Sequence, residues 1–158
     1  MKYKRVKRET LGQIKGTITS GETIGEVISN TEFGIYGKLI NLSKLNIDEK
    51  NLIPIAIRDE IEEGKAKIIL TLENGIRKEY EIEITKIYKN NNSDNKSMLV
   101  KVTDEKLLNL TGGIIQGMSG APIIQNGKFI GAITHVFVNR PQEGYAVFGD
   151  LMIKQSNQ

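Results

Sequence analysis

The stretch TGGIIQGMSGAPIIQNGKFIGAITHVFVN, from Thr111 to Asn139, organises the rest of the chain. At its centre, GMSGAP at 117–122, a serine stands between glycines with a proline three residues on. Glycines allow a sharp backbone bend and let another chain approach closely. Successive N–H groups in such a turn can converge where a negatively charged oxygen would form. The pattern predicts either a serine nucleophile on a tight turn or an ordinary glycine-rich turn between two strands.

Two hairpin signals surround this centre. Asn126-Gly127 is a favoured two-residue turn between the runs 122–125 and 128–138. Asn74-Gly75 is a second turn of the same type, between two alternating runs. Apolar side chains share one face along 66–72 and 80–84, whereas the glutamates at 79, 81 and 83 face water. The sequence therefore predicts two antiparallel hairpins.

The rest of the chain alternates in the same way, with almost no helical periodicity, which predicts an all-β fold built as an antiparallel barrel. Pro54 places the apolar run 52–58 at a sheet edge or a bulge. Residues 104–110 can form one or two helical turns, with Asp104 as N-cap and Gly112 near the end. Further strands are expected at 13–20, 23–29, 33–39, 98–103 and 144–150, with a turn at 21–22 and a polar connection at 43–51.

Composition excludes several kinds of chemistry. The chain has 158 residues, 39% of them hydrophobic and 26% charged, which fits one folded domain. It has no cysteine and one histidine, so thiol catalysis, disulfides, cysteine metal sites and a multi-histidine metal site are excluded. No metal and no cofactor is expected. No apolar run approaches the roughly 18 residues of a membrane span, and the start lacks the apolar segment of a signal peptide.

Positive charge is concentrated at the start of the chain. The formal net charge is +3, but residues 1–8 alone carry five lysines and arginines and no acidic residue. This start is interpreted as a solvated segment or the end of a linker. The alternative is a contact with nucleic acid or a membrane surface, which basic tails also make.

Acyl transfer by a serine needs a base within hydrogen-bond reach and a group that orients the base. Ser119 is the candidate nucleophile, and His135 is the only histidine available as a base. His135 follows sixteen residues later on the outgoing strand of the second hairpin, so it can approach Ser119 or simply line a cleft. Asp104 can orient a base, cap a helix, or do both. No phosphate-binding glycine loop is present.

The motif at 117–122 resembles the Gly-x-Ser-Gly-x-Pro motif of trypsin-like serine peptidases. The run from 112 to 139 closely resembles the SpoIVB peptidase family, the stage IV sporulation protein B of endospore-forming bacteria. Looser matches are ETIGEVISNTEFGIYGKL at 22–39, VKVTDEKLL at 100–108 and GYAV at 144–147. The resemblance therefore covers most of residues 22–153.

The resemblance implies a serine endopeptidase of trypsin-like, double-barrel fold that cleaves itself and a partner in the complex controlling a sporulation sigma factor. It implies a location in the space between mother cell and forespore. Ser119 matches the family nucleophile and Asp104 the aspartate implicated with it. The N–H groups of Gly117 and Ser119 would form the oxyanion hole. His135 matches a family histidine that is not the catalytic one, and it is expected to form a wall of the substrate cleft.

One departure from the family pattern shapes the expectation. The family's catalytic histidine lies upstream, in an Ala-Leu-Gly-His-type segment that this sequence does not contain, and the membrane anchor and PDZ domain are also missing. The chain is therefore expected to be the second barrel plus part of the first, with a basic start and first strand at 1–21, a partial peptidase domain at 22–153 and a polar tail at 154–158.

Two functions follow from this expectation. The first is an incomplete peptidase, weakly active alone, whose partners are a protein or peptide substrate and the missing N-terminal part of the enzyme, with no nucleic acid and no membrane span. The second is a non-catalytic β-module that binds a peptide or protein along a strand edge beside Ser119. The missing histidine keeps both open.

Overall fold

The first predicted hairpin forms the longest pairing in the computed structural model. Strand β5 (Gly64–Thr71) pairs antiparallel with β6 (Arg77–Ile87), with Ile68 opposite Tyr80. The predicted apolar positions of both strands are buried, and the three glutamates of β6 are exposed. Alternation of side chains across a pleated strand produces this arrangement, because successive residues point to opposite faces.

The second hairpin is confirmed as well. Strand β8 (Pro122–Gln125) pairs with β9 (Lys128–Phe137) across a turn in which Asn126 and Gly127 have φ of 51° and 75°. Positive φ at both central residues is the geometry of a type I′ turn, whose twist matches the flanking strands. The predicted glycine-rich stretch therefore leads directly into a hairpin.

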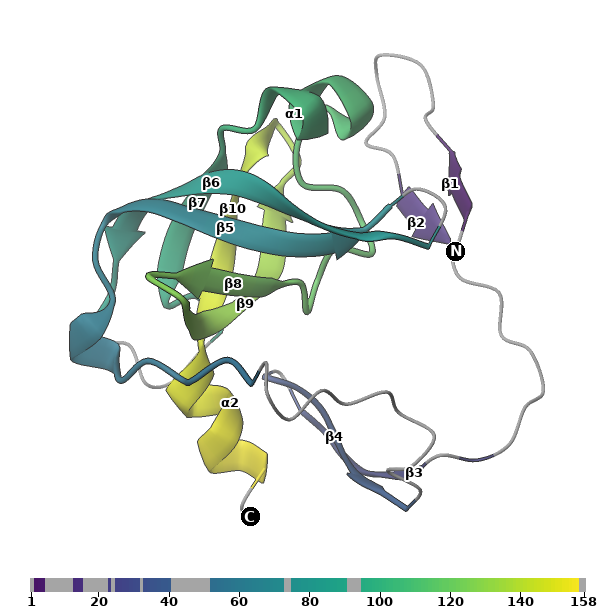
Figure 1. The fold of residues 1–158 in the computed structure, drawn as a ribbon, viewed down its shortest axis with the longest axis vertical. Helices are drawn as coiled ribbons and strands as arrows, with labels where there is room; N and C mark the ends of the chain where they lie inside the picture. The colour runs from purple at the N-terminus through teal and green to yellow at the C-terminus, as the bar shows by residue number, and fades with distance from the viewer. Residues whose placement is uncertain are drawn as a thin grey trace.

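Six antiparallel strands close into one barrel, in the order β10-β7-β6-β5-β8-β9, with β9 pairing back to β10 (Figure 1). The two strands not yet given are β7 (Met98–Val102) and β10 (Arg140–Phe148). The expected strand at 144–150 is thus longer at its start and ends two residues sooner. One hydrophobic cluster fills the interior and includes fully buried Ile68, Met98 and Phe148.

Two helices lie at opposite ends of the barrel (Figure 1). Helix α1 (Glu105–Thr111) begins at the predicted N-cap, Asp104, and ends at Gly112 in the left-handed conformation. Helix α2 (Gly149–Ser156) follows β10 directly. Residues 154–156 of the predicted polar tail continue α2. In α2 Leu151 is buried against the barrel, and this single apolar contact face is too short to show a helical period in the sequence.

The run 52–58 is not a regular strand. Only Ile55 forms a bridge, parallel to Phe129, and a 3-10 helix η3 (Arg58–Glu60) follows. Arg58 donates to both carboxylate oxygens of Asp150 in α2, at 3.1 and 2.9 Å, and its guanidinium lies 4.7 Å from the Phe148 ring centroid. These two charge-assisted hydrogen bonds, both donated by Nη2 of Arg58, fasten the segment before β5 to α2.

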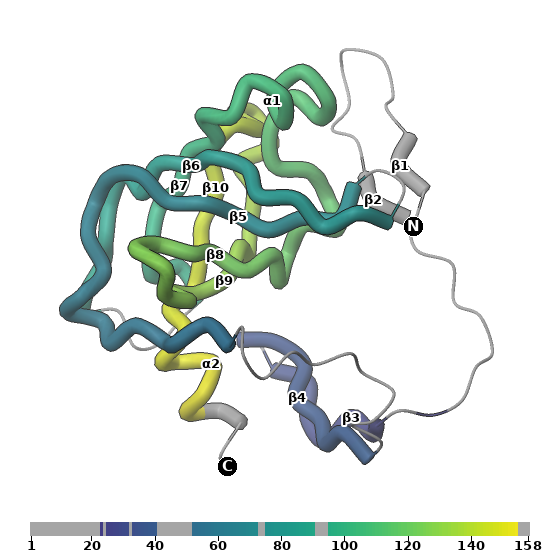
Figure 2. The backbone as a smooth tube through the Cα atoms, in the orientation of Figure 1, coloured from purple at the N-terminus to yellow at the C-terminus, as the bar shows by residue number. Residues whose placement is uncertain are grey.

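The upstream strands form separate two-stranded sheets. Strand β1 (Lys2–Lys4) pairs with β2 (Gln13–Lys15), and β3 (Gly25–Thr31) pairs with β4 (Gly34–Leu39). Figure 2 shows the β3–β4 hairpin outside the barrel, where β4 contacts α2. Phe33 of its turn packs against the barrel core.

The structure describes residues 2–4, 13–15, 23, 25–31, 33–40, 52–72, 75–90 and 95–156. The predicted turn at 21–22, the polar connection at 43–51, Asn74 and the second half of the strand predicted at 13–20 lie outside these residues. In the described part of the chain, no helix is both long and apolar enough to cross a bilayer.

Candidate active site

Ser119 lies on an exposed turn between α1 and β8. The N–H of Met118 donates to the carbonyl of Ile115 at 3.1 Å, and the N–H of Ala121 donates to the carbonyl of Met118 at 2.9 Å. Gly117 and Gly120 have φ of 96° and 88°, which residues with a side chain rarely adopt. The glycines on both sides of the serine are therefore needed for the turn itself.

Among the described residues, the N–H groups of Gln116, Gly117 and Ser119 have no acceptor. Gly117 and Ser119 are the pair expected to form the oxyanion hole. Both residues are exposed, so an oxygen from another molecule can reach them. Unused donors beside an exposed hydroxyl are the parts that a site for a developing oxyanion requires.

The turn is fixed to β9 by backbone and side-chain bonds. The N–H of Gly120 donates to the carbonyl of Ile133 at 2.8 Å, and the Ser119 hydroxyl donates to the carbonyl of Thr134 at 2.8 Å. Thr134 is itself held, because its hydroxyl donates to the carbonyls of Asn95 and Tyr145 at 2.8 and 3.2 Å. Ser119 Oγ therefore occupies a defined position over the middle of β9.

The segment before the turn is tied down by a buried threonine. The Thr111 hydroxyl donates to the carbonyls of Leu107 and Gly113 at 2.9 and 2.6 Å. The N–H of Ile114 donates to the carbonyl of Pro141 at 2.6 Å, at the start of β10. The loop from 112 to 118 therefore runs from the end of α1 across the start of β10 and into Ser119.

One edge of β9 is open beside Ser119. Strand β8 pairs with β9 only as far as Pro122 opposite Ala132, whereas β9 continues to Phe137 with β10 as its other neighbour. From Thr134 onward, the side of β9 away from β10 faces no other strand among the described residues. An extended peptide can pair with such an edge.

His135 lies on this part of β9, opposite Tyr145, and its side chain is exposed. Among the described residues the Ser119 hydroxyl bonds to the neighbouring carbonyl of Thr134 and not to His135. The structure therefore brings His135 next to the open edge, without making it a partner of the serine.

Asp104 is engaged elsewhere. One carboxylate oxygen accepts from the N–H of Leu107 at 2.9 Å as the cap of α1, and the other accepts from the N–H of Glu81 at 3.2 Å. In the described part of the chain neither oxygen contacts Ser119 or His135. The capping role predicted for Asp104 is confirmed, and a role in orienting a base stays a prediction.

Comparison with known proteins identifies the family of this chain. The model of the SpoIVB peptidase S55 family matches residues 1–153. The chain belongs to the SpoIVB peptidase family. Among curated proteins, none matches the sequence.

Solved structures resemble this SpoIVB-family chain in fold. The active form of the Rv3671c protease from M. tuberculosis superposes with a TM-score of 0.56 at 15% identity, over 83% of this chain and 56% of the protease. The HtrA-type protease AlgW with a decapeptide superposes with a TM-score of 0.57 at 13% identity, over 84% of this chain and 39% of AlgW. The fold is that of the trypsin-like proteases, and the chain spans about half the length of these two structures.

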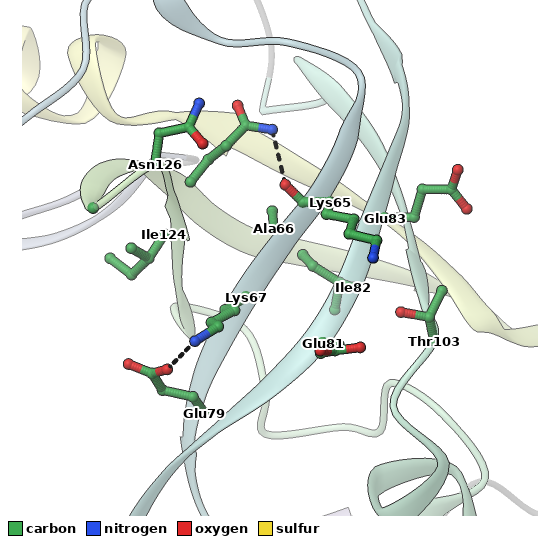
Figure 3. Close-up of a pocket in the computed structure, with 12 residues that line it drawn as sticks. Lys65, Ala66, Lys67, Glu79, Glu81, Ile82, Glu83, Thr103, Ile124 and Asn126 are labelled. Carbon is green, nitrogen blue, oxygen red and sulfur yellow. Dashed lines mark hydrogen bonds and ion pairs between the residues drawn. The ribbon is translucent and has the colours of Figure 1, made fainter.

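A separate groove of about 570 Å³ crosses the outer face of β5, β6 and β8 (Figure 3). Its lining includes Lys65, Lys67 and the three exposed glutamates of β6, and none of the predicted site residues. Lys67 Nζ lies 2.7 Å from Glu79 Oε2, and this hydrogen bond raises the pKa of Lys67. The described residues hold no group of three or more histidines and carboxylates suited to a metal ion.

Sequence reasoning predicted Ser119, Gly117, His135 and Asp104 as site residues, but not the groups that hold them in place. The Thr134 carbonyl carries no sequence signal, because every residue has one. Gly144 of β10 did carry one, since a glycine inside a strand often marks a close approach of another chain segment.

Proposed function

We propose that this chain supplies the nucleophile and the oxyanion site of a SpoIVB-type serine endopeptidase. Ser119 is the nucleophile, the N–H groups of Gly117 and Ser119 bind the oxyanion, and the substrate is a protein or peptide. The observation that carries the proposal is the exposed serine hydroxyl on a turn whose Gly117 and Ser119 N–H groups have no acceptor among the described residues. Membership of the peptidase family supports it.

The chemistry follows from these groups. Ser119 Oγ attacks the carbonyl carbon of a peptide bond, a base takes the hydroxyl proton, and the negative oxygen forms beside the two N–H groups. The C–N bond then breaks, and the base returns the proton to the leaving amine. Water repeats the sequence on the acyl-enzyme, which restores the hydroxyl and releases an acid.

The base is the missing part. His135 is the only histidine of the chain, and the serine hydroxyl bonds to a backbone carbonyl instead. We therefore propose that the base comes from a histidine outside this chain, in a first-barrel segment that docks beside the turn. Without it, acylation loses orders of magnitude in rate, and only the oxyanion site still assists.

The surface left for such a segment is apolar. Val27, Ile28 and Ile35 of the β3–β4 hairpin are each 68–70% exposed, and the strands of this sheet pair only with each other in the described part of the chain. Unpaired strand edges with exposed aliphatic side chains favour cover by another β-structure. A β-rich first-barrel segment fits this surface.

The biological setting is part of the same proposal. We propose that the peptidase acts in sporulation signalling, where cleavage of a partner in a signalling complex activates a sigma factor, and the name of the SpoIVB family supports this setting. The intermembrane space between mother cell and forespore is the proposed location.

A fluorophosphonate probe tests the nucleophile directly. We expect slow labelling of Ser119, located by peptide mass spectrometry, with little or no turnover of a casein-type substrate by the chain alone. Labelling should vanish in Ser119→Ala and persist in the control Ser29→Ala, which removes a hydroxyl from β3. Rapid casein turnover that Ser119→Ala abolishes would refute the need for an external base.

The open edge of β9 favours one alternative, a non-catalytic module that binds an extended peptide. In that case peptide binding survives Ser119→Ala, no cleavage occurs, and the fluorophosphonate leaves Ser119 unlabelled. A negative charge introduced at the edge by His135→Glu would then weaken binding of an acidic peptide more than binding of a basic one.

A further inference from the structure

Strand β9 has one extra residue at the point where it holds the candidate nucleophile. Ile133 pairs with Ala146 of β10 and His135 pairs with Tyr145, so Thr134 between them has no partner on β10 in the register. An extra residue of this kind is a β-bulge, which bends the strand and is frequent beside active sites. The bulged residue is also the one whose carbonyl accepts the serine hydroxyl.

The bulge allows two consecutive carbonyls of β9 to bind the same turn. In a regular strand, consecutive carbonyls point to opposite edges. Here the carbonyl of Ile133 accepts the N–H of Gly120 at 2.8 Å, and the next carbonyl, that of Thr134, accepts the hydroxyl of Ser119 at 2.8 Å. Without the extra residue the second carbonyl would face β10, and the serine hydroxyl would lose its acceptor.

The Thr134 side chain holds the bulge on its other side. Its hydroxyl donates to the carbonyl of Tyr145 on β10 at 3.2 Å and to the carbonyl of Asn95, before β7, at 2.8 Å. A hydroxyl has one proton, so the two acceptors share it. Removing this donor from a partly buried position leaves both carbonyls without it, which is costly. The hydroxyl therefore fixes the backbone whose carbonyl holds Ser119.

We propose that Thr134 is a positioning residue for the nucleophile. Its hydroxyl fixes the bulge, and the bulge directs the carbonyl of Thr134 at Ser119 Oγ. Because Ser119 Oγ donates its proton to β9, its lone pairs lie on its other sides, from which a reacting carbonyl carbon can approach. This inference rests on the proposed function of Ser119 as nucleophile.

A second bulge of the same kind provides a matched control. In β6, Ile84 pairs with Val100 of β7 and Lys86 pairs with Leu99, so Thr85 is the extra residue. The Thr85 hydroxyl donates to the carbonyl of Leu99 at 3.2 Å. In the closed barrel β6 lies opposite β9, three strands away in either direction. Loss of this hydroxyl therefore disturbs a bulge of the barrel without reaching Ser119.

Fluorophosphonate labelling of Ser119 over a range of probe concentrations measures the limiting rate and the half-saturating concentration separately. Thr134→Val keeps the shape of the side chain and removes the hydroxyl. Its limiting rate should fall at least about tenfold, because a misplacement of about 1 Å can cost roughly 100-fold in rate. The half-saturating concentration should stay within about twofold, since the probe still binds.

Two further variants isolate the hydroxyl. Thr134→Ser retains it and should label within about threefold of the wild-type limiting rate. Thr85→Val should leave the limiting rate unchanged. Urea unfolding establishes that each variant is folded. If Thr134→Val does not fold, Thr134→Ala replaces it with the same expectation, since it places no methyl group against the two carbonyls.

Three results would overturn this assignment, in different ways. Equal limiting rates in wild type and a folded Thr134→Val overturn the role of Thr134 and leave the nucleophile in place. The same follows if Thr134→Ser is as slow as Thr134→Val, or if Thr85→Val slows labelling equally, which would assign the effect to loosening of the barrel. Wild type that is not labelled at Ser119 overturns the proposed function and this inference with it.

Discussion

The barrel strands and the β3–β4 hairpin have similar patterns of aliphatic residues, but these residues are buried in the barrel and exposed in the hairpin. Both contain strands in which aliphatic residues recur. In the barrel, Ile68, Ile82 and Ile123 are at most 1% exposed. In the hairpin, Ile28 and Ile35 are 70% and 68% exposed.

This difference shows that recurring apolar residues predict a β-strand but do not predict whether its apolar face is buried. The six barrel strands close on themselves, so their apolar faces share one buried interior, whereas the hairpin is a sheet of two strands. A lone two-stranded hairpin has marginal stability in water. In the function proposed above, the exposed aliphatic residues of the hairpin are the surface that a first-barrel segment covers.

Amide hydrogen exchange gives the largest contrast between the two regions. Amides in the middle of β5, β6 and β9 should exchange only by global unfolding, which costs about 5–15 kcal/mol in small domains. Amides of β3 and β4 should exchange orders of magnitude faster, because the hairpin opens without the barrel. Equal protection, measured by mass spectrometry on peptic peptides, would mean that the hairpin is already covered in the isolated chain.

Truncation of matched isoleucines gives the next largest effect. Ile68→Ala should lower the free energy of unfolding by about 2–5 kcal/mol, since it leaves a cavity in the barrel core. Ile35→Ala, at 68% exposure on β4, should change it by less than about 0.5 kcal/mol. Urea unfolding of the two variants measures both free energies. A large loss of unfolding free energy in Ile35→Ala would contradict the expected difference between the barrel and the hairpin.

Local sequence signals predicted most of the barrel. The alternation at 66–72 and 80–84, the Asn126-Gly127 turn and the Asp104 cap each depend on neighbours within a few residues, and all are present in the structure. The Ser119 turn was predicted for the same reason, since its glycines lie within two residues of the serine.

Contacts between distant segments were not predictable in this way. Arg58 meets Asp150 across 92 residues, and nothing near either residue indicates the other. The carbonyl partner of Ser119 and the position of Ile114 beside Gly144 depend on how the loop crosses β9 and β10. Helix α2 was missed because its apolar contact with the barrel is short and follows a strand without a break.

The smallest expected effect is that of substituting Asp104, which caps α1 and bonds to the barrel strand β6. Asp104→Ala should cost about 0.5–2 kcal/mol of stability through the lost N-cap, whereas Asp104→Asn should retain most of it, because asparagine caps well. Fluorophosphonate labelling of Ser119 should be equal in Asp104→Asn and wild type. A stable Asp104→Asn variant with much slower labelling would assign Asp104 a part in catalysis.

The central claim is that this chain positions the nucleophile Ser119 but does not supply the base that activates it. The rate of fluorophosphonate labelling at Ser119, compared between wild type and His135→Ala, tests it most directly. We predict slow labelling in both proteins, with rates within about twofold of each other, because the Ser119 hydroxyl bonds to the Thr134 carbonyl and not to His135. Fast labelling that falls by orders of magnitude in His135→Ala would contradict the claim and make His135 the base.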